Sequence, residues 1–286
     1  MFTVGKFSAS DIFDTNRYAH DPRNDFLNWT AADAGTWDYA ADAWGYSVGA
    51  AAEWYQGRWT LRTGVFDLSE IPNSETLDHG FHQFQWDGEL ERRHELMGMP
   101  GKLQVTLFDS RGRMGLLGEA VNVAQASGTS VPAALVSVRR YRDRAGISFS
   151  LEQQLSSDLG LFARFGKAGG NVEAYEFTEV DRTASAGVSL NGKRWGRADD
   201  TVALMGIVNG ISGTREQFLN AGGLGILVGD AQLPHPEAEQ ILETYYRLAV
   251  VKWAQLTLDY QYIVNPAYNT DRGPASVVAL RLHAQL

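Results

Sequence analysis

The sequence predicts an all-β protein, a transmembrane antiparallel up-and-down β-barrel with about twelve strands. Three observations lead to this class: apolar and polar residues alternate with a period of two, many alternating segments run about ten residues or more, and long connections alternate with short turns. Because side chains of a strand point alternately to opposite faces, each segment has one apolar face. Tilted strands need about 9 to 11 residues to cross a bilayer, whereas strands of soluble proteins average about five or six.

The strands can be placed in order along the chain. The least regular is expected at 172–190, where the apolar positions change parity between Phe177 and Ala184, which indicates a bulge or a break. The expected strands are residues 2–7, 46–55, 58–68, 79–92, 101–110, 144–155, 158–168, 172–190, 196–209, 241–250, 253–264 and 276–286.

The connections between these strands differ in length in a regular way. Long connections on one rim and short turns on the other are typical of outer-membrane barrels. Two connections depart from the alternation, because the one near 93–101 is intermediate in length and the one near residue 169 is short. Long connections are expected at 8–41, 68–78, 111–143, 210–238 and 265–274, and short turns near residues 56, 157, 194 and 251.

The last strand shows most clearly why the chain should span a membrane. Leu280 and Leu282 lie on one face of it, while Arg281 and His283 lie on the other. Backbone groups left unpaired in hydrocarbon are costly, so strands of this kind must close into a barrel with lipid outside and water inside. Aromatic residues near strand ends, such as Trp54, fit the interfacial girdles of such barrels. A soluble sandwich with these aromatics in its core is the alternative.

Composition excludes several other classes. Of the 286 residues 44% are hydrophobic, the mean hydropathy is −0.25, and no apolar run is long enough for a transmembrane helix. The net charge of −9 argues against nucleic acid as a partner. The chain has no cysteine, and His79 and His82 point to opposite faces of a strand, so no metal site is expected. No catalytic set is recognisable, and no cofactor is expected.

The first residues, MFTVGKFSAS, lack the basic stretch followed by an apolar stretch that marks a signal peptide. Either the protein is cytoplasmic or a leader has been removed.

The sequence nevertheless resembles the carbohydrate-selective porins of Gram-negative outer membranes, of the OprB type, in blocks that cover nearly the whole chain in the family's order. These blocks are FDTNRYAHDPRNDFLNW (13–29), LEQQL (151–155), DLGLFARFGKAGG (158–170), FTEVDR (177–182), GKRWGRADDTVALMGIVNGIS (192–212), AGGLGILVGD (221–230), EQILETYYRL (239–248), LDYQYIVNPAYNTDRGP (258–274) and LRLHAQL (280–286).

The resemblance implies a barrel of about sixteen strands, a signal peptide and passive uptake of sugars across the outer membrane. By that comparison about four strands are missing on the N-terminal side, so the chain is expected to be a single, incomplete barrel domain, a C-terminal portion of the family fold. It also ends in Leu286, where the family usually ends in an aromatic residue. We expect residues 2–7 either to pair with 276–286 and close a smaller barrel, or to leave an open one.

Residues 8–41 form the most informative connection, because charged and aromatic residues are unusually dense in it. Long structured loops in a compact domain are usually functional. Folded inward, this one would narrow the pore and present aromatic planes and charged groups to a sugar. A loop packed on its extracellular neighbours is the alternative. Candidates for pore-lining or constriction residues are Asp14, Arg17, Arg23, Asp25, Trp29, Trp37, Glu53, Arg62, Arg164, Glu243, Arg247, Asp259, Arg281 and His283.

The function expected from these observations is passive diffusion of mono- and small oligosaccharides through a water-filled barrel. Its partners would be permeating sugars and outer-membrane lipid, and a homo-oligomer is left open. Two alternatives come from other classes: a non-conducting structural or adhesive barrel of the outer membrane, and a soluble carbohydrate-binding β-sandwich.

Overall fold

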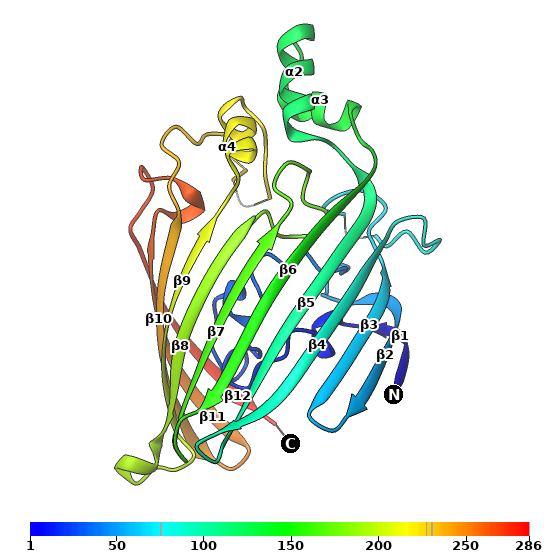
Figure 1. The fold of residues 1–286 in the computed structure, drawn as a ribbon. Coiled ribbons are helices and arrows are strands. Elements are labelled where there is room, and N and C mark those ends of the chain that lie inside the picture. Colours follow the sequence, from blue (N-terminus) through cyan, green and yellow to red (C-terminus); the bar gives the residue numbers. More distant parts are fainter. Residues whose placement is uncertain (75, 227, 230, 286) are drawn as a thin grey trace.

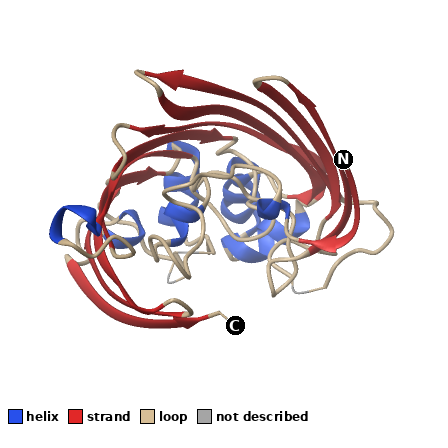
Figure 2. Cartoon of the chain, turned by 90° about the horizontal axis from the view of Figure 1, so that it is seen from below, coloured by secondary structure: helices blue, strands red, loops and turns tan. Residues whose placement is uncertain are grey.

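The computed structural model describes residues 1–74, 76–226, 228–229 and 231–285. Within them, twelve antiparallel strands form one sheet in which every strand pairs with its neighbours in chain order, as predicted. The sheet, called the wall below, curves around an interior filled by loops and short helices (Figure 2). The strands are β1 (Phe2–Phe7), β2 (Ser47–Gln56), β3 (Trp59–Asp67), β4 (Phe84–Leu96), β5 (Met99–Met114), β6 (Arg140–Gln154), β7 (Leu159–Ala168), β8 (Arg182–Asn191), β9 (Thr201–Gly210), β10 (Glu239–Val251), β11 (Ala254–Val264) and β12 (Ala275–Ala284).

The two faces of the wall differ as the alternation predicts. In β3, Leu61 and Val65 are exposed on the convex face, whereas Arg62 and Phe66 are buried on the concave face. The same division holds at the end of the chain, where Leu280 is exposed and Arg281 contacts the interior. Leu286, the last position of the alternating pattern, lies outside the described residues.

The two rims are also unlike (Figure 1). One rim carries the long connections and three of the α-helices, α2 (Leu117–Ser127), α3 (Val131–Ser137) and α4 (Gly213–Asn220), which share an apolar core. The other rim carries short turns and the 3-10 helix η2 (Gly192–Trp195). The third 3-10 helix, η3 (Pro266–Tyr268), precedes β12.

Three sequence predictions of local structure were wrong. The connection near 93–101 is a tight turn at Met97 and Gly98, and both residues have positive φ (53° and 75°), as two-residue hairpin turns require. The strand expected at 172–190 begins only at Arg182, because residues 169–181 form a long connection that folds inward. The connection expected at 111–143 is shorter, because β5 continues to Met114 and β6 begins at Arg140.

The wall remains open between its first and last strands (Figure 2). Among the described residues β1 pairs only with β2, and β12 pairs only with β11. Of the two predicted arrangements, the structure therefore has the open one. No helix in the described part of the chain is both long and apolar enough to cross a membrane.

Candidate functional site

Residues 8–46, which connect β1 to β2, lie on the concave face of the wall (Figure 1) and are called the inner segment below. The segment contains the 3-10 helix η1 (Ala9–Asp11) and the short helix α1 (Trp29–Ala32). Asn28 caps α1, since its side chain accepts a hydrogen bond from the amide of Thr30 (3.1 Å). The segment is otherwise irregular, so most of its backbone groups need partners from elsewhere.

A buried ion pair joins the inner segment to β7. Nε of Arg164, a residue only 1% exposed, lies 3.4 Å from Oδ2 of Asp14, and its Nη2 donates to the Asp14 carbonyl (2.9 Å). A second guanidinium nitrogen donates to the carbonyl of Ala31 (2.5 Å), and the Asp14 carboxylate accepts from the amide of Ala34 (2.6 Å). Burial raises the pKa of Asp14 to about 6, although Arg164 opposes the shift. This pair fixes two distant parts of the segment against one strand.

Charged side chains of the last three strands hold the middle of the inner segment. Glu243 of β10 accepts hydrogen bonds from the amides of Leu27 and Asn28 (3.1 Å for the latter). Arg281 of β12 donates to the carbonyl of Asp25 (2.7 Å). The remaining contacts of this kind are Arg281 with the carbonyl of Pro22, Arg247 with the carbonyl of Asn24 (3.0 Å) and His283 with the Asn24 side chain (3.2 Å). Asp259 of β11 lies 3.4 Å from Arg281 and orients it.

Asp38 couples the inner segment to the inward connection 169–181. Its carboxylate accepts hydrogen bonds from the four consecutive amides of residues 175–178, at distances from 2.7 to 3.3 Å. Arg144 of β6, which is fully buried together with Asp38, lies 3.1 Å from the same carboxylate. One carboxylate therefore determines where Phe177 is placed.

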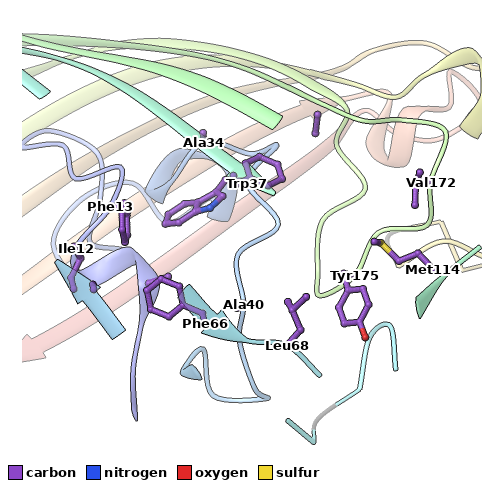
Figure 3. Close-up of a cluster of buried hydrophobic side chains, with 14 residues drawn as sticks. Ile12, Phe13, Ala34, Trp37, Ala40, Phe66, Leu68, Met114, Val172 and Tyr175 are labelled. Atoms are coloured by element: carbon purple, nitrogen blue, oxygen red, sulfur yellow. The ribbon is translucent and has the colours of Figure 1, made fainter. Parts of the chain in front are cut away.

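An apolar core supports the same region. Figure 3 shows Phe13 and Trp37 of the inner segment near Phe66 of β3. The Phe13 ring lies edge-on to both partners, at centroid distances of 6.4 Å to Trp37 and 6.1 Å to Phe66. Nε1 of Trp37 donates to Asp87 of β4 (2.9 Å). The space between this part of the segment and the wall is thus filled by side chains.

A separate charge cluster lies on the concave face of β2, β3 and β4. Arg62 contacts the carboxylates of Glu53 (3.0 Å), Glu89 (2.6 Å) and Glu91 (2.9 Å). Glu89 also accepts from the amide of Asp14 (2.7 Å), which links the cluster to the inner segment. Arg62 is thus paired with three carboxylates, and the cluster keeps an excess of negative charge.

The opposite side of the inner segment contains a hollow of about 380 Å³, called the aromatic hollow. All of its lining residues except Phe177 belong to the inner segment. It extends from Ser10, just after β1, to Pro22, whose carbonyl is bound by Arg281 of β12. The hollow therefore lies on the side where the wall is open.

Aromatic rings and two polar groups shape this hollow. The Phe177 ring is 4.6 Å from Tyr39 and 6.0 Å from Trp29, both edge-on. Trp29 is 39% exposed. Nδ1 of His20 lies 3.4 Å from Oδ1 of Asp33. Burial by itself would lower the pKa of His20, but the hydrogen bond and charge of Asp33 outweigh it, and the pKa is raised.

The structure divides the predicted site residues into three groups. Trp29 and Trp37 line the aromatic hollow. Arg17 is exposed at the short-turn rim, and the largely exposed Arg23 is paired with Asp21 (2.8 Å). The others lie on the wall or in contacts that hold the inner segment: Asp14, Asp25, Glu53, Arg62, Arg164, Glu243, Arg247, Asp259, Arg281 and His283.

Among the lining residues of the hollow that were not predicted, four are aromatic or ionisable: His20, Asp33, Tyr39 and Phe177. Three of them belong to the segment with a high density of charged and aromatic residues. That density indicated the segment as important but did not identify these three residues within it. Phe177 was assigned to a strand. In the described part of the chain, no three His, Asp or Glu side chains are grouped so as to hold a metal ion.

Comparison with known proteins agrees with this architecture. Residues 2–286 match the family described as "Carbohydrate-selective porin, OprB family". The high-pH structure of Pseudomonas putida OprB has a TM-score of 0.76 and 17% sequence identity, with 99% of this chain and 69% of that chain covered. The low-pH structure of the same protein has a TM-score of 0.54 and 13% identity, with 99% and 61% covered. No match was found among the curated proteins compared.

Proposed function

Because the chain belongs to the carbohydrate-selective porin family of the OprB type, we propose that sugars pass along the open side of its inner segment and not between that segment and the wall. As a member of this family it is a porin of the Gram-negative outer membrane and not an enzyme. Its class of function is the passive passage of sugars. We further propose that the inner segment is the constriction of that passage.

The observation that carries the proposal is the aromatic hollow. Sugar rings have apolar faces and a rim of hydroxyl groups, so a suitable site combines aromatic planes with a few hydrogen-bonding groups. The hollow offers the exposed indole of Trp29, the ring of Phe177 and the polar pair His20 and Asp33. It is open on one side, which suits a channel, because binding must be weak enough for the solute to leave.

The charges inside the wall support the same reading. Arg62, Arg164 and Arg144 each contact at least one carboxylate. Their positive charges are thereby neutralised and offer little attraction to an anionic solute. Such an interior suits a neutral polyhydroxylated solute better than an ion.

The outward side of the wall supports insertion in lipid. Leu258, Leu280 and Leu282 are each more than half exposed on the convex face of β11 and β12 (56%, 69% and 75%). Exposed leucines on neighbouring strands form an apolar band, and such a band is the lipid-facing surface of outer-membrane barrels. We propose that these leucines contact outer-membrane lipid.

Saturation-transfer NMR with the full chain in detergent micelles and glucose as the ligand tests the proposed path. The variant Trp29→Ala removes the exposed aromatic plane and should weaken glucose binding about tenfold, which corresponds to about 1.4 kcal/mol. Trp44→Ala is the matched control, because Trp44 is 83% exposed and does not line the hollow. Equal binding by Trp29→Ala and the unaltered chain, or an equal loss in the control, would contradict the proposal.

A further inference from the structure

A second hollow, of about 410 Å³, lies at the short-turn rim and is called the rim hollow. Its walls come from the β2–β3 turn, the end of β4, the start of β5, the end of β6 and residues Arg17 and Tyr18 of the inner segment. It shares no lining residue with the aromatic hollow. The rim hollow is therefore distinct from the aromatic hollow.

The rim hollow has a surplus of positive charge. Four cationic side chains line it, from Arg17, Arg58, Arg93 and Lys102, against the two carboxylates of Glu95 and Glu152. The whole chain, by contrast, carries a net charge of −9. A positive concavity in an acidic protein concentrates anions locally, because low-dielectric walls focus the field.

Not all of these cations are available to a ligand. Nζ of Lys102 donates to the carbonyl of Thr15 (2.7 Å) and lies 3.5 Å from Glu152. Arg93 donates to the carbonyl of Gly57 (3.2 Å). Within the described part of the chain, the side chain of Arg58 makes neither a hydrogen bond nor an ion pair.

Arg17 is held at the hollow by its neighbour. Its guanidinium stands 5.8 Å from the centre of the Tyr18 ring and makes one long hydrogen bond, of 3.5 Å, to the amide oxygen of Gln154. The Tyr18 ring in turn packs against Gly160 of β7, where a Cβ atom would lie 2.1 Å from the ring. Glycine at this position lets Tyr18 approach the strand, and Tyr18 then supports the guanidinium without neutralising it.

We propose that the rim hollow binds a small oxyanion, the carboxylate or phosphate group of a solute, between the guanidinium groups of Arg17 and Arg58. Guanidinium groups present paired N–H donors that match carboxylate and phosphate oxygens in geometry. Neither group is occupied by a carboxylate in the structure, so an anion gains two partners without breaking an existing ion pair.

Isothermal titration calorimetry of the full chain in detergent tests the proposal, with glucuronate, inorganic phosphate and neutral glucose as probes. At low ionic strength glucuronate, phosphate or both should bind, and Arg58→Gln and Arg17→Gln should each weaken that binding at least tenfold. Added salt should weaken it as well, because the site is open to solvent. Binding of glucuronate without phosphate identifies an organic carboxylate as the ligand, and binding of phosphate without glucuronate identifies free phosphate.

Arg92→Gln is the matched control, since Arg92 lies over the Trp59 ring (5.4 Å) and does not line the rim hollow. Absence of anion binding at low ionic strength, or equal weakening by Arg92→Gln and Arg58→Gln, would overturn the proposal. The test of anion binding can be distinguished from the test of the proposed sugar path, because each depends on a different residue. Trp29→Ala should leave anion binding unchanged, and Arg58→Gln should leave the glucose signal unchanged.

Discussion

The side of the inner segment that faces the wall is buried and hydrogen-bonded to eight strands, whereas the side that faces the open edge holds the aromatic hollow and the exposed Trp29. The strands that supply these hydrogen bonds are β4 to β7 and β9 to β12. One stretch of chain thus has a structural face and a face free for solutes. The face toward the wall is structural because polar groups that are buried there require hydrogen-bond partners, which the wall supplies.

The strongest test of this comparison is Arg164→Met. The change leaves the Asp14 carboxylate and two carbonyl groups buried without their partner, and removing one member of a buried pair costs about 3–5 kcal/mol. Hydrogen–deuterium exchange of the amides of the inner segment should show the loss of protection. Arg194→Met is the control, because the Arg194 side chain is 59% exposed and pairs with Asp158 away from the inner segment, so protection of the inner segment should not change. An equal loss of amide protection in the two variants would contradict the conclusion that the buried face holds the inner segment in place.

The second test compares the two faces of the wall itself. Leu280→Arg places a charge on the convex face, where a cation near the bilayer midplane costs about 2–4 kcal/mol. Arg281→Leu removes hydrogen bonds to the inner segment but leaves the convex face apolar. Heat-modifiable folded barrel, measured by gel mobility after reconstitution, should fall much more for Leu280→Arg. A similar loss in both variants would mean that β12 does not present Leu280 to lipid.

Asp38→Asn sharpens the comparison at one point, because Asp38 joins the inner segment to Phe177 of the aromatic hollow. The amide retains the shape but loses the charge, and hydrogen bonds to charged groups are worth about 1.5–3 kcal/mol. Limited proteolysis should cut residues 169–181 faster, and glucose binding should weaken while the strands stay intact. Asp42→Asn is the control, since Asp42 pairs with Lys6 near β1 (2.5 Å). Unchanged cleavage in Asp38→Asn would show that the four amides are held by other contacts.

The smallest expected effect is a pH dependence at Glu176. Burial raises its pKa to about 8, against hydrogen bonds from Ser69 that favour the ionised form. An acid with a raised pKa in the folded state contributes stability that is fully present below its ordinary pKa near 4.5 and is lost as pH rises through about 8. Amide protection of residues 169–181, corrected for intrinsic exchange, should therefore be lower at pH 9 than at pH 6. In Glu176→Gln this difference should vanish, and its persistence would assign the effect to another group.

The wall was predictable because alternation is a local property. The order of Leu280, Arg281, Leu282 and His283 by itself determines which side chains share a face. The extent of β8 was not predictable in the same way. Residues up to Asp181 stay outside the strand because their partners, such as Asp38 and Arg215, lie far away in the sequence.

The candidate site could likewise be predicted only in part from the sequence. Sequence alternation placed Arg164 on the inward face, but its burial depends on the path of the inner segment, whose Asp14 lies 150 residues earlier. Phe177 reaches the aromatic hollow only because Asp38 binds the amides around it. Contacts between irregular segments follow from no periodicity, so the sequence indicated the segment as important without indicating which of its faces is free.

The sequence distances across the interior also constrain the order of folding. Leu27 is bound by Glu243, 216 positions later, and Asp25 by Arg281, 256 positions later. Contacts between such distant residues are slow to form, because the entropy of closing the intervening chain must be lost first. The inner segment can reach β4 to β7 earlier, but the hydrogen bonds of its middle part to Glu243, Arg247 and Arg281 form only when the last three strands are in place. The passage should therefore narrow as a late event, after the wall around it has formed.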